Sequence, residues 1–326
     1  MKFPEGIAAQ PAALATSLAS LKLPSFQGGL IALVGIGASE HAAHGAAAAW
    51  RSAGLQAVAI PATSPPIPAA LTLLISESGR STEVLAYKSP SRTIALTNFA
   101  DSPLAAATAE LILLNSGPDS PVYTTGYTAT LQALGVLGDH WTATVSASAE
   151  TKSAGASASP FDWAALPALV SSALEAPLGA ASAYLDDARL VDVVASGVSV
   201  ATAGEGGLLL RESGRLHTAV HETRNYLHGP MEILDQQTTC LLIGDEREVQ
   251  LAYDVQDYGT KVVLITTRQV ESTEGLAVIK VPEASNGLAK AVLEMVIVQR
   301  LGWDVAQRRG LTVDGFRHRQ SDTKVS

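Results

Sequence analysis

The chain has 326 residues, of which 47% are hydrophobic and 16% charged, and its formal net charge at pH 7 is -9. This length is enough for two cores of ordinary domain size, and the acidic charge argues against a nucleic-acid-binding surface. Cys240 is the only cysteine, which excludes an internal disulfide and a zinc–thiolate cluster. The N-terminus lacks the apolar stretch of a signal peptide, and no apolar run reaches the length of a membrane span. We therefore expect a cytoplasmic protein without membrane or nucleic-acid partners.

The first half of the chain alternates apolar runs with helical segments. "GLIALVGIG" predicts a strand and a tight turn before an alanine-rich helix. The later elements expected in this half are strands at 56–60, 71–76, 92–98 and 109–115, and helices at 82–88 and 127–137. Apolar strands that alternate with helices predict a parallel sheet covered on both faces.

The second half repeats this plan. "LVDVVASG", "CLLIGDEREVQLAY", "KVVLITT" and "LAVIKVPE" follow the order and spacing of four apolar runs in the first half. We therefore predict two copies of one α/β unit. The boundaries expected are an N-terminal segment (1–27), a first domain (28–150), a linker with a bridging helix at 161–186 (151–187), a second domain (188–313) and a polar tail (314–326).

The stretch "SESGRST" (residues 76–82), here named the hydroxyl loop, follows a predicted strand. Ligands of open parallel sheets bind beyond the carboxyl ends of the strands, where small hydroxyls and a glycine let the chain surround a phosphate. The phosphate contacts expected are Ser39, Ser76, Glu77, Ser78 and Ser81. Serine before a helix also serves as an N-cap, and this alternative stays open.

The charge of Glu77 opposes an anion, and Arg80 could offset it. The second copy of the unit has "GDERE" in place of the hydroxyl loop, and its carboxylates would repel an anion. Only the first copy is therefore expected to bind phosphate.

Residues 205–230 carry the remaining candidates. Glu205 and Glu212 are seven residues apart, so on a helix they share one face. "LHGP" ends this segment, because Pro230 stops a helix that precedes it. Without further information, these carboxylates read as solvated surface groups and His228 as an ordinary polar residue.

Taken together, these motifs resemble the sugar isomerase (SIS) family. "GIGAS", "SESGRSTE", "EGGLLLRE" and "HGP" are similar, in register, to the isomerase half of glucosamine-6-phosphate synthase and to free-standing hexosamine-phosphate deaminases and phosphosugar isomerases. The resemblance covers roughly residues 28–326. It implies an α/β fold of two tandem doubly wound, flavodoxin-like domains, each a three-layer α/β/α arrangement.

The resemblance also implies roles for individual residues. Glu212 falls on the base that moves a proton between C1 and C2 of the open-chain sugar. His228 falls on the histidine that opens the sugar ring, contributed across the interface of a homodimer. Lys324 matches the lysine that folds over the site and forms a Schiff base. Glu205 and Arg211 are expected to support the site from behind these groups.

The chain also departs from the family. Two positions that are lysine in the family are Leu209 and Gly126 here, and Glu77 stands where a neutral glutamine is common. "NSGPDSPVYTT" still resembles the family's substrate loop, so Val122 and Thr124, with Asp119, remain candidates for sugar contact.

The function expected is conversion of a hexose or hexosamine 6-phosphate through an enediol or enolamine, in amino sugar metabolism. One carboxylate with a shifted pKa can shuttle the proton, so we expect no cofactor and no metal ion. No glutaminase segment precedes the sugar units, so we expect no glutamine-driven amination. Isomerase and deaminase activity stay open, and the alternative class is a phosphosugar sensor without catalysis.

Overall fold

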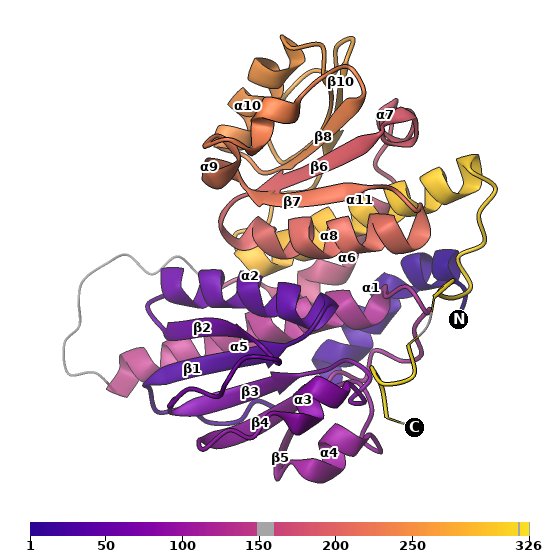
Figure 1. Cartoon of the computed structure of the whole chain (residues 1–326). Helices are drawn as coiled ribbons and strands as arrows, with labels where there is room; N and C mark the ends of the chain where they lie inside the picture. Colours follow the sequence, from indigo (N-terminus) through magenta and orange to yellow (C-terminus); the bar gives the residue numbers. More distant parts are fainter. Residues whose placement is uncertain (149–159, 319, 326) are drawn as a thin grey trace.

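The computed structural model describes residues 1–148, 160–318 and 320–325 (Figure 1). The chain has an α/β fold with two parallel five-stranded sheets. Residues 149–159 of the expected linker region lie outside the described residues. In the part of the chain that the structure describes, no helix is both long enough and apolar enough to cross a membrane.

The first sheet comes from the first half of the chain. Its strands lie in the order β2-β1-β3-β4-β5. They are β1 (Leu30–Gly35), β2 (Gln56–Pro61), β3 (Leu71–Ile75), β4 (Arg92–Thr97) and β5 (Glu110–Leu113). Pairs such as Leu33 with Leu73 fix the register, and β3 is buried along its whole length. A strand buried on both faces carries a continuous apolar run, which is what "LTLLI" provides.

The second sheet has the same topology. Its strands lie in the order β10-β9-β8-β6-β7. Read from the β7 edge and numbered from β6, this is the order 2-1-3-4-5 of the first sheet. The strands are β6 (Leu190–Ala195), β7 (Thr218–Glu222), β8 (Thr238–Ile243), β9 (Lys261–Thr266) and β10 (Leu276–Lys280). The expected internal repeat is therefore present. It includes a fifth strand, β7, that the sequence patterns missed.

Helices cover both faces of each sheet. The helices in the first half are α1 (Phe3–Ser20), α2 (Ala38–Ser52), α3 (Thr82–Ala86), α4 (Pro103–Ala107) and α5 (Thr125–Ser148). The helices that follow are η1 (Trp163–Ala165), α6 (Leu166–Leu174), α7 (Ala181–Asp187), η2 (Gly197–Ser199), α8 (Val200–Ser213), α9 (Thr223–Tyr226), η3 (Pro230–Ile233), α10 (Arg247–Gln256) and α11 (Gly287–Arg308).

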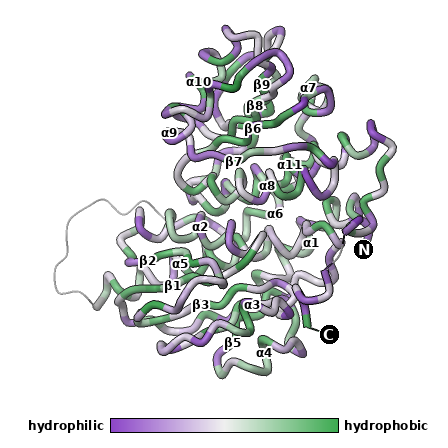
Figure 2. Tube along the Cα trace, in the orientation of Figure 1, coloured by the Kyte–Doolittle hydropathy of each residue, from purple (hydrophilic) through white to green (hydrophobic). Residues whose placement is uncertain are grey.

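One apolar core runs through the middle of the molecule. Helices α2 and α5 lie on the inner face of the first sheet and pack against α8 and α11, which lie on the inner face of the second (Figure 1). Alternate strand residues divide between faces, so Leu73 joins this central core while Leu74 packs outward with α3 and α4. Figure 2 shows hydrophobic segments concentrated along the strands and in this helical layer.

Three expectations about helices need correction. The bridging helix expected at 161–186 is three shorter elements, because the segment between α6 and α7 contains Pro177 and a positive-φ Gly179. The N-terminal segment is largely the helix α1, whose interior Pro11 masked the pattern. Helix α5 extends eleven residues beyond the expected end at 137, to Ser148.

Candidate active site

A cavity of about 350 Å³ lies beyond the carboxyl end of β3. Five parts of the chain line it: the turn into α2, the hydroxyl loop with the start of α3, the loop that contains Tyr123, α8 and the C-terminal tail. The expected site residues among its lining are Ser39, Ser76, Glu77, Ser78, Ser81, Glu205, Glu212 and Lys324. The structure therefore brings most of the predicted site into one cavity, although these residues come from distant parts of the sequence.

The hydroxyl loop presents side chains to this cavity. Ser76 Oγ and Ser81 Oγ share a hydrogen bond of 3.2 Å. Ser81 is the N-cap residue of α3, but its side chain makes no capping hydrogen bond. Gly79 has φ +62°, and a β-carbon there would lie 2.2 Å from Ser102 Oγ, so the tight turn requires glycine. The geometry favours ligand binding over capping for the Ser81 hydroxyl.

Helix α8 carries two carboxyl groups into the cavity. Glu205 and Glu212 lie on the same face, as their spacing predicts. Burial raises the pKa of Glu212 to about 7, against a lowering effect of Lys324. Burial, and then the nearby Glu212 and Asp119, raise the pKa of Glu205 well above its usual range. The protonated form of Glu205 is thus favoured, while a pKa of about 7 suits Glu212 to exchange its proton near neutral pH, as a general base must.

The C-terminal tail is bound to the hydroxyl loop. Thr82 donates from its backbone to the Thr323 carbonyl (3.3 Å) and from Oγ1 to the Asp322 carbonyl (2.7 Å). The Val325 N–H donates to the Arg80 carbonyl at 3.0 Å. These bonds close the cavity on one side and fix the tail's position.

Lys324 is the cation that the tail brings to the cavity. Its Nζ donates to Tyr123 OH at 2.8 Å, and the side chain lies over the Tyr123 ring, 5.3 Å from the centroid. Its positive charge partly opposes the effect of burial, which raises the pKa values of both Glu77 and Glu212. Among the described lining residues, Lys324 is the only lysine or arginine.

Tyr123 is a site residue that the sequence patterns missed. Burial and the charge of Glu77 raise the pKa of its hydroxyl, while Lys324 and Ser78 lower it. Its signal was its position inside the expected substrate loop, one residue after Val122.

Glu77 reaches the cavity from the hydroxyl loop. Its Oε1 accepts a hydrogen bond from Asn98 Nδ2 at 3.0 Å, and the residue is 7% exposed. Burial and the charge of Asp119 raise its pKa to about 7, with opposing effects of Asn98 and Lys324. A second carboxyl that titrates near neutrality therefore lies in the same cavity as Glu212.

The expected sugar contacts in the substrate loop lie outside the cavity. Val122 and Thr124 are buried and do not line it. Thr124 N donates to Asp119 Oδ2 at 3.0 Å and Gly126 N donates to the same oxygen at 2.7 Å. The Asp119 carboxylate thus accepts from the backbone at the start of α5, and this loop acts as a support.

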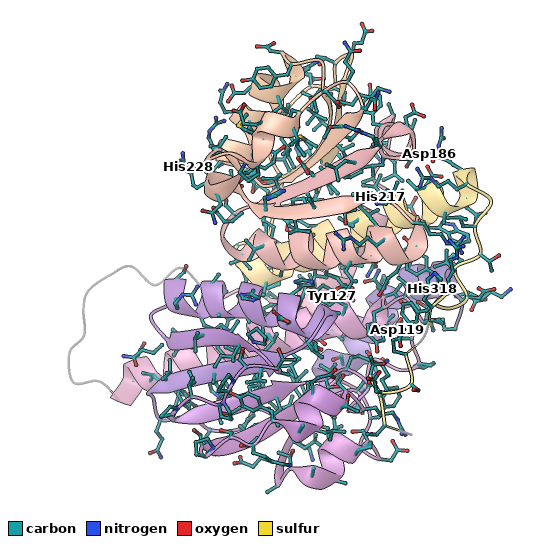
Figure 3. The ribbon with its side chains drawn as sticks, in the orientation of Figure 1. Asp119, Tyr127, Asp186, His217, His228 and His318 are labelled. Atoms are coloured by element: carbon teal, nitrogen blue, oxygen red, sulfur yellow. The ribbon has the colours of Figure 1, made fainter. Side chains whose placement is uncertain are left out.

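Two further expected residues also lie apart from the cavity of their own chain. Arg211 Nε donates to Thr218 Oγ1 at 2.7 Å, which joins α8 to β7. His228 is exposed just after α9, and Figure 3 shows it on the far side of the second sheet from Asp119. Leu209, at one family lysine position, is fully buried in the core. None of the described residues that line the cavity is a histidine.

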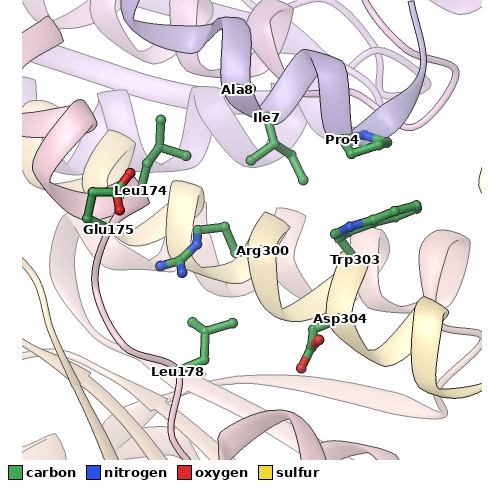
Figure 4. A pocket seen from close by; sticks show the side chains of 9 residues that line it. All are labelled: Pro4, Ile7, Ala8, Leu174, Glu175, Leu178, Arg300, Trp303 and Asp304. Atoms are coloured by element: carbon green, nitrogen blue, oxygen red, sulfur yellow. The ribbon is translucent and has the colours of Figure 1, made fainter.

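A second cavity, of about 540 Å³, lies between α1 and α11 (Figure 4). It is lined mainly by apolar side chains such as Ile7, Leu174 and Trp303. Its only described cation, Arg300, already donates to the carbonyls of Ala173 (3.0 Å) and Ala176 (2.6 Å). Unlike the first cavity, this one has no serine, threonine or tyrosine among its described lining residues, and the first is therefore the candidate active site.

Comparison with known proteins identifies relatives of the chain. The family model "SIS domain" matches residues 184–301. A glutamine–fructose-6-phosphate aminotransferase (isomerizing) of Thermus thermophilus is 29% identical over 264 residues, which are 76% of this chain and 43% of that protein. The chain thus spans less than half the length of the curated relatives that it matches.

Solved structures share the fold. The C-terminal domain of glucosamine-fructose-6-phosphate aminotransferase from Francisella tularensis has a TM-score of 0.81 and 20% identity, covering 96% of this chain and 97% of that one. Glucosamine-6-phosphate deaminase from Thermotoga maritima has a TM-score of 0.75 and 19% identity, covering 100% of both chains. Residues 184–301 thus match the SIS domain, and the chain is similar in sequence and fold to part of glutamine–fructose-6-phosphate aminotransferases.

Proposed function

We propose that the chain is an enzyme that converts a hexose or hexosamine 6-phosphate, as a ketose/aldose isomerase or as a deaminase. The observation that carries this proposal is that one cavity is lined by the serine hydroxyls of the hydroxyl loop, by Lys324 and by Glu212, whose pKa is about 7. The names of the relatives support the same class, since they act on fructose 6-phosphate or glucosamine 6-phosphate.

In the proposed reaction, the phosphate lies on the hydroxyl loop and C1 and C2 lie beside α8. Glu212 removes a proton from one of these carbons and returns it to the other, through an enediol or enolamine. In deamination, protonation of the enolamine at C1 gives a C2 imine, water adds to C2, and the resulting carbinolamine expels ammonia and leaves the ketose. In this proposal the Lys324 amine condenses with the open-chain carbonyl and releases water. The hydrogen bond that Lys324 Nζ donates to Tyr123 OH at 2.8 Å supports this role, because it orients the amine. Glu205, whose pKa is raised by burial and by Glu212, supports the base.

We propose further that the working unit is a homodimer and that His228 of each subunit completes the site of the other. Ring opening needs an acid and base that is active near neutral pH, which histidine supplies. Exposure of His228 on its own subunit fits this arrangement. The fold of this unit would be two tandem doubly wound domains of three layers, at 28–150 and 188–313, with the tail 314–326 over the site.

A phosphosugar-binding protein without catalysis is the second candidate. The observation that favours it is the lack of a histidine among the described residues that line the cavity of one chain.

One assay separates these possibilities. The protein is incubated with a panel of hexose 6-phosphates and hexosamine 6-phosphates, and both ketose and ammonia are measured. Ammonia with ketose selects deamination, and ketose alone selects isomerisation. Binding without either product selects the non-catalytic candidate.

A further inference from the structure

We propose that Glu77 binds the substrate's phosphate as a protonated acid that donates a hydrogen bond to a phosphate oxygen, so that the site takes up a proton with its ligand. This inference rests on the proposed function, because it assumes that the hydroxyl loop receives a phosphate. It adds a binding residue and a pH dependence that the hydroxyls alone would not give.

The position of Glu77 is fixed by its backbone. Its carbonyl accepts from Thr97 Oγ1 (3.0 Å) and from the Asn98 N–H (2.8 Å). Ser76 and Ser78, its neighbours in the chain, line the same cavity. A ligand held by these two serines would therefore lie beside the carboxyl of Glu77.

One oxygen of this carboxyl is committed and the other is available. Oε1 accepts from Asn98 Nδ2, which also donates to the Gly117 carbonyl at 2.8 Å. Oε2 has no hydrogen-bond partner among the described residues. It is not one of the fully buried side-chain oxygens, and Glu77 lines the cavity. A proton on Oε2 would turn this atom into a donor directed at the ligand.

The surrounding charges favour the protonated form. Asp119, Tyr123 and Lys324 are the titratable groups that act on Glu77, and Lys324 alone favours its ionised form. Three further carboxyl groups line the cavity: Glu83, Glu205 and Glu212. Arg80, which could have offset the charge, does not line the cavity.

A bound phosphate strengthens this preference. Burial and Asp119 already raise the pKa of Glu77 to about 7, so half of the molecules carry the proton near neutral pH. A phosphate dianion beside it is a further like charge, which raises the pKa again. Because pKa shifts and binding are linked, the dianion must bind more tightly to the protonated site.

The test is to titrate the protein with fructose 6-phosphate, glucosamine 6-phosphate and inorganic phosphate by calorimetry at pH 7.5, in buffers of different ionisation enthalpy. The dependence of the heat on the buffer counts the protons taken up. We expect wild type to take up a substantial fraction of one proton and Glu77→Gln to take up close to none. Glu271→Gln makes the same change on an exposed carboxylate and should behave as wild type.

Affinity provides a second measurement. Above pH 7 the phosphate is already a dianion, with a pKa of about 6. Wild-type Kd should therefore rise by up to about tenfold per pH unit between pH 7 and 9, while the Kd of Glu77→Gln stays nearly constant. The variant should bind more tightly than wild type at pH 9.

The outcomes are distinct. Phosphosugar binding by wild type without proton uptake, or equal uptake by Glu77→Gln, overturns the inference and leaves the proposed function intact. If wild type binds none of the three ligands at any pH, both are wrong. Should Glu77→Gln fail to fold, proton uptake is compared between wild type and Glu212→Gln, because Glu212 also has a pKa of about 7. Uptake that persists in Glu212→Gln supports the inference, and uptake that disappears with Glu212 overturns it.

Discussion

The side chain of Glu77 lies directly against Gly126. A β-carbon at position 126 would lie 2.6 Å from Glu77 Cγ and 2.9 Å from its Cδ and Oε1. No real β-carbon makes contacts this short with a fixed neighbour, so the carboxyl can occupy its place only because residue 126 is glycine. The glycine and the glutamate, which looked like two separate departures from the family, are one structural pair.

Gly126→Ala should therefore displace the Glu77 carboxyl. Overpacking of this kind costs about 1–3 kcal/mol of unfolding free energy. Glu77→Ala removes the colliding atoms, so the double variant Glu77→Ala/Gly126→Ala should recover most of the loss. Urea unfolding of the two single variants and the double variant gives the coupling energy. A coupling energy near zero would mean that the two residues do not compete for this space.

Loss of the hydroxyls of the loop should weaken phosphosugar binding. A hydrogen bond to a charged group is worth about 1.5–3 kcal/mol, so Ser78→Ala/Ser81→Ala should raise KM by roughly 100-fold or more. Ser102→Ala is the matched control, because this serine caps α4 through Ala105 N. The control should lower Tm and leave KM unchanged. If the double variant instead lowers Tm with KM unchanged, its serines are structural.

The buried carboxyls should make the fold less stable at alkaline pH. The folded-state pKa values of Glu77 and Glu212 are about 7, above the value of about 4.3 in the unfolded chain. Their contribution to stability is therefore fully present below about pH 4 and is lost as pH rises through 7. Thermal unfolding of Glu77→Gln and Glu212→Gln should show Tm above wild type at pH 8, with a smaller difference at pH 5. Equal differences at both pH values would contradict the shifted pKa values.

Mixing of two inactive variants tests the shared site. Suppose that Glu212 and His228 of one site come from different subunits. A hybrid dimer of one Glu212→Gln subunit and one His228→Ala subunit then contains one intact site and one doubly defective site. An equal mixture that exchanges subunits freely should then regain about a quarter of wild-type activity. A mixture that stays inactive, with subunit exchange shown by tagged chains, would place His228 outside the partner's site.

The sequence predicted those features that depend on local patterns. Apolar runs located nine of the ten strands, and the repeat of four runs predicted the two sheets. The strand β7 was missed because its burial is broken by exposed Val220, so it lacks a continuous apolar run. The bridging helix was predicted as continuous although Pro177 and Gly179 interrupt it.

The site was predicted in part. Serines of the hydroxyl loop and the two glutamates of α8 gave local signals of spacing and composition. The position of Tyr123 in the expected substrate loop was its only signal, and the fit of Glu77 against Gly126 gave none, because both depend on contacts between loops that only the folded sheet brings together. The sequence did not indicate that Val122 and Thr124 are buried and do not line the cavity; their contact with sugar stays a prediction.

The measurement that tests the account most directly is proton exchange at C1 and C2. Proton NMR of hexose and hexosamine 6-phosphates in D2O detects enolisation, whether the net reaction is isomerisation or deamination. Wild type should replace the C1 or C2 hydrogen of its substrate with deuterium, and Glu212→Gln should do so at least about 100-fold more slowly while still binding the phosphosugar. The control Glu271→Gln should exchange as wild type does. No exchange by wild type with any sugar of the panel, or undiminished exchange by Glu212→Gln, would contradict the proposed catalytic role of this cavity.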